Sequence, residues 1–514
     1  MRSSSTKGNS QEIVRNGNWP GVILAAAAVI CLLLPQASFA AWSTSADENI
    51  AVTSALGFQG RPQVIYDGDG GYFATWRDYE TPGVFAQHYD VLGDAMWGEA
   101  GALVCSENNS QVEGVSDGAG GVIVTWSENS DTYAQHLDAD GAPLWEVDGI
   151  PVLLGDSDTW IAPDGQGGVI VMGYYGHVNR VDYNGNLLWG AADDAPLYTE
   201  TGNAWAPKIV SDGRGGAVLA WMDDDSDGND VVCVQRVDAD GDFLWNGGEP
   251  LVISTGSGNY AGCPRLTSSG NGGAFVVWYE EPDGYEIRGQ GIDADGDIQW
   301  ADGGVVVASA GSIYTDSLDL AGNGRGGAFF TWADSDDYTL YAQYVDASGD
   351  PVWDDPLAMS VEGEFSDVAQ HTRKTVEDGR GGFITAWYND SDQVKAQRCG
   401  ADGIALWGDG GAVLSNGTSI YYGPKLASNG QGGAVAIWVD DRSDDPDTGQ
   451  NIYLQGIDAD GKLGDPGYTD QGRDVHHHSC LIDASQSPAN PWAGFLLLAA
   501  ACACVLSFVR REAR

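Results

Sequence analysis

The stretch from Lys208 to Ile253, KIVSDGRGGAVLAWMDDDSDGNDVVCVQRVDADGDFLWNGGEPLVI, is one copy of a pattern that recurs eight times along the chain. A Gly-Gly pair marks each copy, and in seven of the eight a tryptophan follows six residues after the first glycine. The first glycines are Gly70, Gly120, Gly167, Gly215, Gly272, Gly326, Gly381 and Gly432. The third copy departs from the rule, with Gly173 in place of the tryptophan. Regular recurrence of this kind indicates one repeat architecture.

Each copy predicts four short strands. The first ends at a DGxGG turn, where glycines allow positive φ, and the second follows at once, as at Ala217–Trp221. An acidic loop leads to a third strand, Asp230–Asp238, and a DADG turn opens a fourth strand that carries a second tryptophan. This tryptophan recurs as Trp97, Trp145, Trp189, Trp245, Trp300, Trp353 and Trp407. Recurrence in register predicts that the tryptophans pack between neighbouring units.

Four strands in about 50 residues, repeated eight times, predict an all-β fold: a single eight-bladed β-propeller over residues 41–467. The eighth copy has its third strand, Asn451–Asp458, but lacks the fourth strand with its tryptophan. Asn49–Ser54, which precedes the first copy, reads like an unattached fourth strand. We therefore expect this N-terminal strand to complete the last blade and to remove its free sheet edge.

The first 40 residues predict a signal peptide, residues 1–40. Basic residues precede an apolar run over residues 21–34, and Ser38-Phe39-Ala40 has small residues where a signal peptidase cuts. Cleavage is expected after Ala40, and an uncleaved N-terminal anchor is the alternative.

The C-terminal end predicts attachment to a membrane. We interpret residues 468–491 as a polar linker, residues 492–509 as a transmembrane segment and residues 510–514 as a basic tail that stays cytoplasmic. The short motif around Cys480, the apolar span and the final arginines together resemble bacterial C-terminal sorting signals. That resemblance implies processing or lipid attachment at Cys480, and a plain tail anchor is the alternative. The protein is expected to be exported, on the cell surface or the outer face of a bacterial membrane.

The charge balance excludes one class of partner. The chain has 74 acidic and 24 basic residues, and residues 41–509 keep 72 and 18 of them, a net charge of −54. A field of this sign repels nucleic acid and favours cations and solubility. We expect a monomer that binds an unidentified protein or glycan ligand.

The acidic loops after the second strands are the predicted binding sites. Asp223, Asp225 and Asp227, followed by Gly228, match the opening of a D-x-D-x-D-G calcium loop, although no glutamate stands at position 12. The sequence therefore predicts calcium at Asp223, Asp225, Asp227 and Asp230, and a solvated acidic loop is the alternative. Two residues after each second-strand tryptophan stands an acid, or an amide in the case of Asn389. Because such loops emerge on one face of a propeller, these residues predict a ring of carboxylates.

The D-x-x-G-x-x-x-W part of each copy, with Asp238, Gly241 and Trp245 in the fourth, resembles the tryptophan-docking repeats of quinoprotein-type propellers. The repeat as a whole resembles those of secreted bacterial eight-bladed β-propeller proteins with a C-terminal sorting signal. Both resemblances imply the fold and leave the activity open. Cys233 and Cys263 lie in neighbouring copies and could pair, but buried free thiols fit the sequence better.

No catalytic residues are predicted, because no nucleophile, phosphate-binding or zinc-protease motif is present in the sequence. A surface binding module, with calcium in its acidic loops, is the first functional hypothesis. A secreted polysaccharide-active or quinoprotein-type enzyme is the second, and a structural surface protein is the third. The irregular third copy, with GYYGH at Gly173–His177, is the only hint of an inserted polar site.

Overall fold

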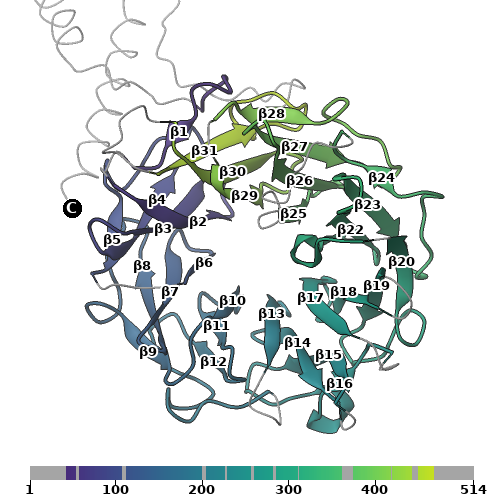
Figure 1. Cartoon of the computed structure of the whole chain (residues 1–514). Coiled ribbons are helices and arrows are strands. Elements are labelled where there is room, and N and C mark those ends of the chain that lie inside the picture. The colour runs from purple at the N-terminus through teal and green to yellow at the C-terminus, as the bar shows by residue number, and fades with distance from the viewer. Residues whose placement is uncertain are drawn as a thin grey trace, which may run out of the picture. The chain divides into compact units, whose positions relative to one another are not determined.

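The computed structural model describes residues 42–467 apart from 54–56, 107–110, 199–203, 226–227, 256–259, 282–284, 311, 362–373, 418–419 and 443–449. In this part of the chain eight sheets form a ring, and the first strand of each repeat lies nearest the centre (Figure 1). Neighbouring strands within each sheet are antiparallel and follow one another in the order of the sequence, except at the point of closure. The predicted eight-bladed propeller is confirmed.

The first four blades have the following strands. Blade one contains β2 (Gln59–Tyr66), β3 (Tyr72–Asp78), β4 (Gly83–Tyr89) and β5 (Ala102–Cys105). Blade two contains β6 (Val112–Ser116), β7 (Val122–Glu128), β8 (Asp131–Leu137) and β9 (Ile150–Leu153). Blade three contains β10 (Trp160–Pro163), β11 (Val169–Met172) and β12 (Val178–Val181). Blade four contains β13 (Trp205–Ser211), β14 (Ala217–Asp224), β15 (Asp230–Val237) and β16 (Leu251–Val252), with the short 3-10 turn η1 (Trp245–Gly248).

The other four blades complete the ring. Blade five contains β17 (Ala261–Ser268), β18 (Ala274–Glu280), β19 (Tyr285–Ile292) and β20 (Val305–Ala310). Blade six contains β21 (Asp319–Gly322), β22 (Ala328–Ala333), β23 (Leu340–Val345) and β24 (Leu357–Ala358), preceded by η2 (Thr315–Ser317). Blade seven contains β25 (Lys374–Glu377), β26 (Phe383–Tyr388), β27 (Val394–Cys399) and β28 (Ala412–Ser415). Blade eight contains β29 (Ile420–Ser428), β30 (Ala434–Asp440), β31 (Asn451–Ile457) and β1 (Ile50–Ala51).

The tryptophans of the second strands lie in the hydrophobic core between blades, as the recurrence predicted. Those of blades one, two, four, five, six, seven and eight are at most 2% exposed: Trp76, Trp126, Trp221, Trp278, Trp332, Trp387 and Trp438. Each packs with apolar residues of its own and an adjacent blade. Burial of so many large aromatic side chains supplies much of the hydrophobic free energy that holds the ring together.

The second tryptophan of the repeat links each blade to the next. It lies before the fourth strand rather than in it, which corrects the prediction: Trp245, for example, precedes β16 (Leu251–Val252). The indole nitrogen of Trp245 donates a hydrogen bond of 3.1 Å to the backbone carbonyl of Ala294 in the following blade. The ring lies against Gly296, whose φ is +87° and where a Cβ would come within 2.7 Å of the indole. The glycine of the DADG turn is therefore required for two reasons: the turn needs its positive φ, and the indole approaches too closely to leave room for a Cβ. The same ring–glycine packing recurs at Trp97–Gly141, Trp145–Gly185, Trp189–Gly241, Trp300–Gly349, Trp353–Gly403 and Trp407–Gly461.

The N-terminal segment closes the ring. Strand β1 pairs antiparallel with β31, Ile50 opposite Leu454 and Ala51 opposite Tyr453, which confirms the expected N-terminal fourth strand. Trp42 adds a contact that the sequence did not predict: its indole lies against Gly93 and donates 3.1 Å to the carbonyl of Val91 in blade one. It supplies the tryptophan that the eighth copy lacks.

The third blade departs from the pattern, since its sheet has three strands in the described residues. Where the other blades have a tryptophan, Gly173 faces the buried carboxylate of Asp156. A single antiparallel bridge, His177 to Leu197, stands at the position of the fourth strand.

Within the described residues no helix is long and apolar enough to cross a membrane. The predicted signal peptide, linker, transmembrane segment (492–509) and basic tail all lie outside the described residues.

Candidate functional site

One residue of each innermost strand occupies the same position in all eight blades. It lies four residues before the Asp, Asn or Ser that begins the turn to the second strand. In blade four this residue is Lys208, which pairs with Ala220, the residue before Trp221. We call the eight equivalent residues the axial ring: Gln63, Glu113, Trp160, Lys208, Arg265, Asp319, Lys374 and Lys425.

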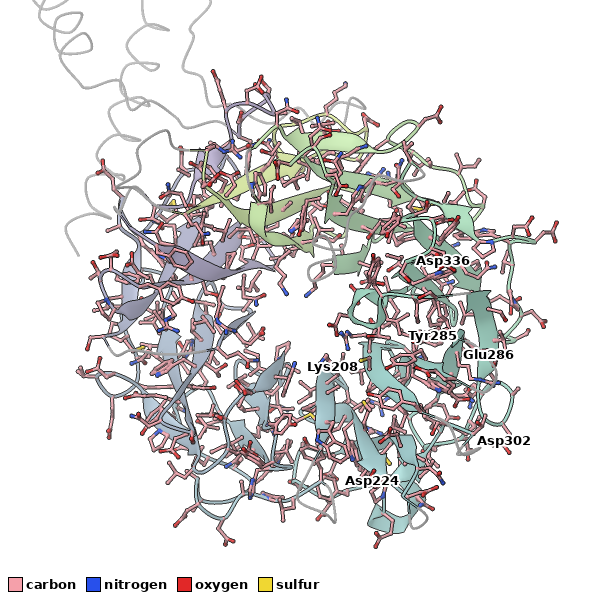
Figure 2. All side chains as sticks on the ribbon, in the orientation of Figure 1. Lys208, Asp224, Tyr285, Glu286, Asp302 and Asp336 are labelled. Carbon is pink, nitrogen blue, oxygen red and sulfur yellow. The ribbon has the colours of Figure 1, made fainter. Side chains whose placement is uncertain are left out.

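The axial ring carries positive charge in a strongly acidic protein. With all six groups ionised, its four basic and two acidic side chains carry a formal charge of 4 − 2 = +2, whereas the whole chain has a formal net charge of −50. Figure 2 shows Lys208 pointing into the space that the innermost strands enclose. Lys374 is exposed and the other charged members are half-buried, so solvent reaches the ring. An anion is the ligand that this local charge favours.

Lys208 has an unusual environment. Its Nζ donates a hydrogen bond of 2.8 Å to the carbonyl of Pro207 and lies 4.6 Å from the centre of the Trp160 ring. Burial, and then the positive charge of Arg265, hold the pKa of Lys208 well below its usual value, although Cys263 and Glu113 act in the opposite direction. The ammonium form of Lys208 is thus destabilised by low dielectric and by a like charge.

The remaining charges of the ring influence one another across the axis. Burial lowers the pKa of Lys425, and burial raises that of Glu113, an effect that the positive charges of Lys425 and Lys374 partly offset. In the described residues none of these three side chains makes a direct hydrogen bond or ion pair. Their charges are therefore available to a ligand.

Asp319 is held more firmly. Its carboxylate accepts hydrogen bonds from the backbone N–H of Thr375 at 2.6 Å and of Leu320 at 3.0 Å, and burial raises its pKa. Asp319 thus joins the innermost strands of blades six and seven, β21 and β25.

Two pockets lie at the DGxGG turns, four residues along the chain from the axial ring. One of about 280 Å³ is lined by the turns of blades one to three, and one of about 320 Å³ by the turns of blades six and seven. Arg325 and Arg380 border the second pocket, and the guanidinium of Arg325 lies beside Gly381. This face adds exposed arginines to the positive charge of the axial ring.

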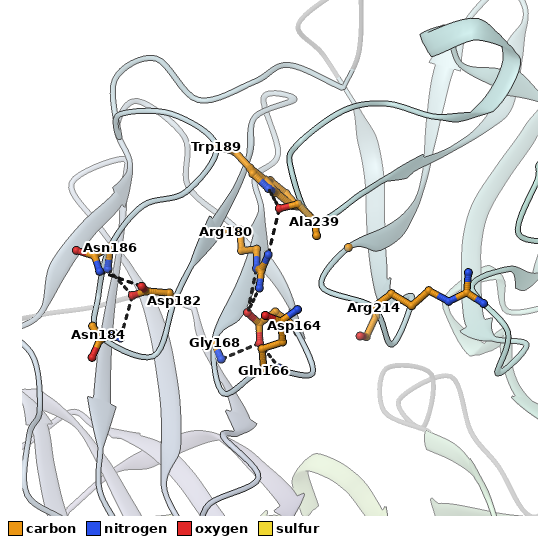
Figure 3. A network of polar contacts seen from close by, with 12 residues as sticks. Asp164, Gln166, Gly168, Arg180, Asp182, Asn184, Asn186, Trp189, Arg214 and Ala239 are labelled. Carbon is orange, nitrogen blue, oxygen red and sulfur yellow. Dashed lines mark hydrogen bonds and ion pairs between the residues drawn. The ribbon is translucent and has the colours of Figure 1, made fainter.

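A second group of basic residues is structural. Figure 3 shows Arg180 paired with Asp164. Nε of Arg180 lies 2.9 Å, and Nη2 lies 2.8 Å, from the same carboxylate oxygen of Asp164. Its Nη1 donates to the carbonyl of Ala239, which also accepts the indole N–H of Trp189. We call such a pair a turn lock, because Asp164 also accepts two backbone N–H groups of its turn. Equivalent locks are Asp67–His88, Asp117–His136, Asp212–Arg236 and Asp378–Arg398.

The residues of the predicted calcium loop have protein partners. Asp223 is 8% exposed and accepts the indole N–H of Trp221 at 3.2 Å. Asp225 accepts the backbone and side-chain N–H groups of Asn229, both at 2.9 Å. Asp230 lies opposite Asp224, and burial and that neighbouring charge raise its pKa. Asp227 lies outside the described residues, which contain no group of three or more His, Cys, Asp or Glu side chains that could hold a metal ion.

Three of the other acids after the second-strand tryptophans, Asp78, Glu280 and Asp440, are also buried. Glu280 and Asp440 accept the indole N–H of Trp278 and Trp438 at 3.0 and 2.8 Å, and both are less than 5% exposed. Asp78 accepts backbone N–H groups of its own loop. These carboxylates satisfy buried donors.

Blade three contains an Asp–His pair in which Asp156 is buried and the side chain of His177 is 32% exposed. The carboxylate of Asp156 lies 3.1 Å from Nδ1 of His177 and accepts the backbone N–H of Tyr175 at 2.8 Å. Burial raises the pKa of Asp156, partly offset by these hydrogen bonds. The third copy therefore does contain inserted polar groups, Asp156 and His177. They occupy the place next to Gly173 where the other blades have a tryptophan.

None of the described cysteines, Cys105, Cys233, Cys263 and Cys399, forms a disulfide; Cys233 is buried as expected, whereas Cys263 is only partly buried. Cys480 lies outside the described residues.

The axial ring was missed in the sequence. The signal was present, because the residue four positions before each turn is charged in six of the eight copies. It was overlooked because the motif was defined from the Gly-Gly pair forward.

No protein-family model and no curated protein matches the chain. Among solved structures, BamB from Moraxella catarrhalis is 14% identical, with 80% of this chain and 98% of that chain covered and a TM-score of 0.39. The BP39L lectin from Burkholderia pseudomallei is 11% identical, with coverages of 70% and 100% and a TM-score of 0.45. The dihydro-heme d1 dehydrogenase NirN is 13% identical, with coverages of 86% and 83% and a TM-score of 0.38. Similarities this low say nothing about the ligand or activity of this protein.

Proposed function

We propose that the protein is an exported binding module that holds an anionic ligand at its axial ring. The observation that carries the proposal is the formal charge of that ring, +2 in a chain of formal net charge −50. Only 18 basic residues lie between residues 41 and 509, and four of them occupy this one position of the repeat. If the basic residues were scattered at random over the repeats, few of them would fall on the same position. Their concentration at this position supports a site for negative charge.

The donors and acceptors of the ring suit a ligand with both carboxylate and hydroxyl groups. Arg265 offers a planar fork that matches a carboxylate, and the lysines offer point charges. Glu113 and Asp319 supply acceptors for hydroxyl groups. Partial burial strengthens each of these interactions over its value in water. Export is part of the proposal and is supported by the signal-like pattern of residues 1–40.

Calorimetry of the purified protein with citrate as an anionic probe tests the proposal. Citrate is expected to bind, glucose is not, and the affinity for citrate should fall between about 50 and 500 mM salt because screening weakens charge attraction. Lys374→Gln and Lys425→Gln should each weaken citrate binding about tenfold, the effect of losing one charge-assisted contact.

Lys462→Gln is the matched control. Lys462 is exposed at the last turn of blade eight, so its loss changes the net charge equally without touching the axial ring. If Lys462→Gln weakens citrate binding as much as Lys374→Gln, the attraction is unspecific and the axial ring is not the site. Absence of any heat with citrate would also contradict the proposal.

A further inference from the structure

We propose that Lys208 is a nucleophilic lysine that forms an imine with an anionic carbonyl compound, a 2-oxo acid, at the axial ring. The inference rests on the proposed function for the capture of the carboxylate. It adds a covalent step that anion binding alone does not require.

The contacts of Lys208 include no ion pair in the described residues. Its Nζ donates to the carbonyl of Pro207 at 2.8 Å, and in the described residues it has no carboxylate within ion-pair distance. The indole of Trp160 covers one side at 4.6 Å. An ion pair holds a lysine in the ammonium form. A lysine that contacts only an aromatic face and a backbone carbonyl loses less interaction energy when it gives up its proton.

The surroundings of Lys208 favour the neutral amine. Burial and the neighbouring charge of Arg265 keep its pKa well below the usual range of lysine. Desolvation and a cationic neighbour are the two means by which proteins activate a lysine for imine formation. Because the neutral amine has the lone pair that attacks the carbonyl carbon, both effects raise the reactive fraction near neutral pH.

The reaction can be balanced with groups of the axial ring. The Lys208 nitrogen bonds to the carbonyl carbon, and the carbonyl oxygen takes up the proton that the amine loses. The resulting carbinolamine then expels its hydroxyl as water, with one added proton, and a protonated imine remains. Glu113 interacts electrostatically with Lys208, and burial raises its pKa, which favours Glu113 as the group that supplies that proton. Arg265, on the same position of the neighbouring innermost strand, is the group we assign to the carboxylate of the 2-oxo acid.

The chain offers internal controls, because its body has few lysines. Lys374 and Lys425 share the axial ring, whereas Lys395 and Lys462 lie elsewhere in blades seven and eight. Lys462 is exposed and serves as the comparison lysine outside the axial ring.

The test is reductive trapping. The full-length protein is incubated with glyoxylate and cyanoborohydride at pH 7, digested, and each lysine is scored for the carboxymethyl adduct by mass spectrometry. Lys208 should be modified at least about tenfold faster than Lys462, because the fraction of neutral amine sets the rate. Added citrate should slow the labelling of Lys208 and not of Lys462. Lys208→Arg should lose the fast adduct.

Equal labelling of Lys208 and Lys462, or no adduct at Lys208, would overturn the imine. The two proposals fail separately on the wild-type protein. Citrate binding without trapping refutes only the imine, whereas fast trapping at Lys208 without citrate binding refutes only the proposed binding function.

Discussion

The indole nitrogen of Trp42 lies 3.1 Å from the carbonyl oxygen of Val91, and this hydrogen bond closes the ring of blades. Trp97 makes the same contact with Ala139 in the next pair of blades, at 3.0 Å. The N-terminal segment therefore supplies both the fourth strand and the docking tryptophan of blade eight. Gln455 adds to the closure, since its Nε2 donates to the carbonyl of Ser43 at 2.6 Å.

Trp42→Ala should destabilise the whole propeller by about 3–5 kcal/mol, because Trp42 is only 3% exposed and its loss opens a cavity at the closure. Trp42→Phe should cost less, since it keeps most of the packing and loses about 1 kcal/mol with the hydrogen bond. Urea denaturation gives both values. Val147→Ala, at an 86% exposed position, is the control and should leave the free energy of unfolding unchanged.

The turn locks predict a contrast between two neighbouring arginines. Arg236→Ala should cost about 3–5 kcal/mol, because it leaves the buried carboxylate of Asp212 without its partner. Arg214→Gln, on the exposed tip of the same turn, should change the stability by less than about 0.5 kcal/mol. Thermal unfolding followed by circular dichroism measures both. Equal effects would mean that Asp212–Arg236 does not hold the turn.

The lock in blade two predicts acid sensitivity. Burial acts to raise the pKa of Asp117, but hydrogen bonds from His136 and from two backbone N–H groups outweigh it and lower the pKa below 3.8. A carboxyl group with a lowered folded-state pKa stabilises the fold above the unfolded value and loses this contribution as pH falls through the folded value. Asp117→Asn should therefore be less stable than wild type at pH 5, and the difference should shrink towards pH 3.

That measurement is best made between pH 5 and pH 3, the range in which aspartate of the unfolded chain titrates. Denaturant titrations at several pH values supply the free energies. A difference that stays constant from pH 5 to 3 would show that Asp117 keeps its charge or does not contribute.

The blade count, the strand order and the N-terminal closure could be predicted from the sequence, because they follow from a repeat that is local and strict. Other constant features of the repeat were present but not interpreted. Gln235 joins the third strand to the segment before the fourth strand: its Oε1 accepts the backbone N–H of Trp245 at 2.8 Å, and its Nε2 donates to the carbonyl of Glu249 at 2.8 Å. A glutamine in this position looks like an ordinary polar residue until the partner strand is known.

The site was harder to predict, because the spacing of residues along the sequence does not show which side chains are buried or which way they point. The acids after Trp221, Trp278 and Trp438 looked like a solvent-facing ring, yet each carboxylate turns back to the indole N–H of its tryptophan. Lys208 was treated as the start of a strand, and only the closed ring brings it near Glu113 and Lys425 from distant blades. Long-range charge clusters depend on closure of the fold.

Calcium at Asp223, Asp225, Asp227 and Asp230 stays a prediction. If it is right, calcium at 100 times its dissociation constant should stabilise the fold by about 2.7 kcal/mol, and Asp225→Asn should reduce the effect. Because Asp225 already binds Asn229, the variant must be compared with wild type in chelator as well. No heat in calorimetry and no rise in melting temperature would contradict calcium binding.

Blade three predicts that Gly173 cannot carry a side chain while Asp156 is present. A Cβ at Gly173 would overlap the carboxyl group of Asp156, which is buried and held by hydrogen bonds from Tyr175 and His177. Gly173→Ala should therefore cost about 1–3 kcal/mol through overpacking. In an Asp156→Ala background the overlap is gone, so the same substitution should cost much less. Equal costs in the two backgrounds would show that Asp156 and Gly173 are not coupled, and that the missing tryptophan of this blade is compensated elsewhere.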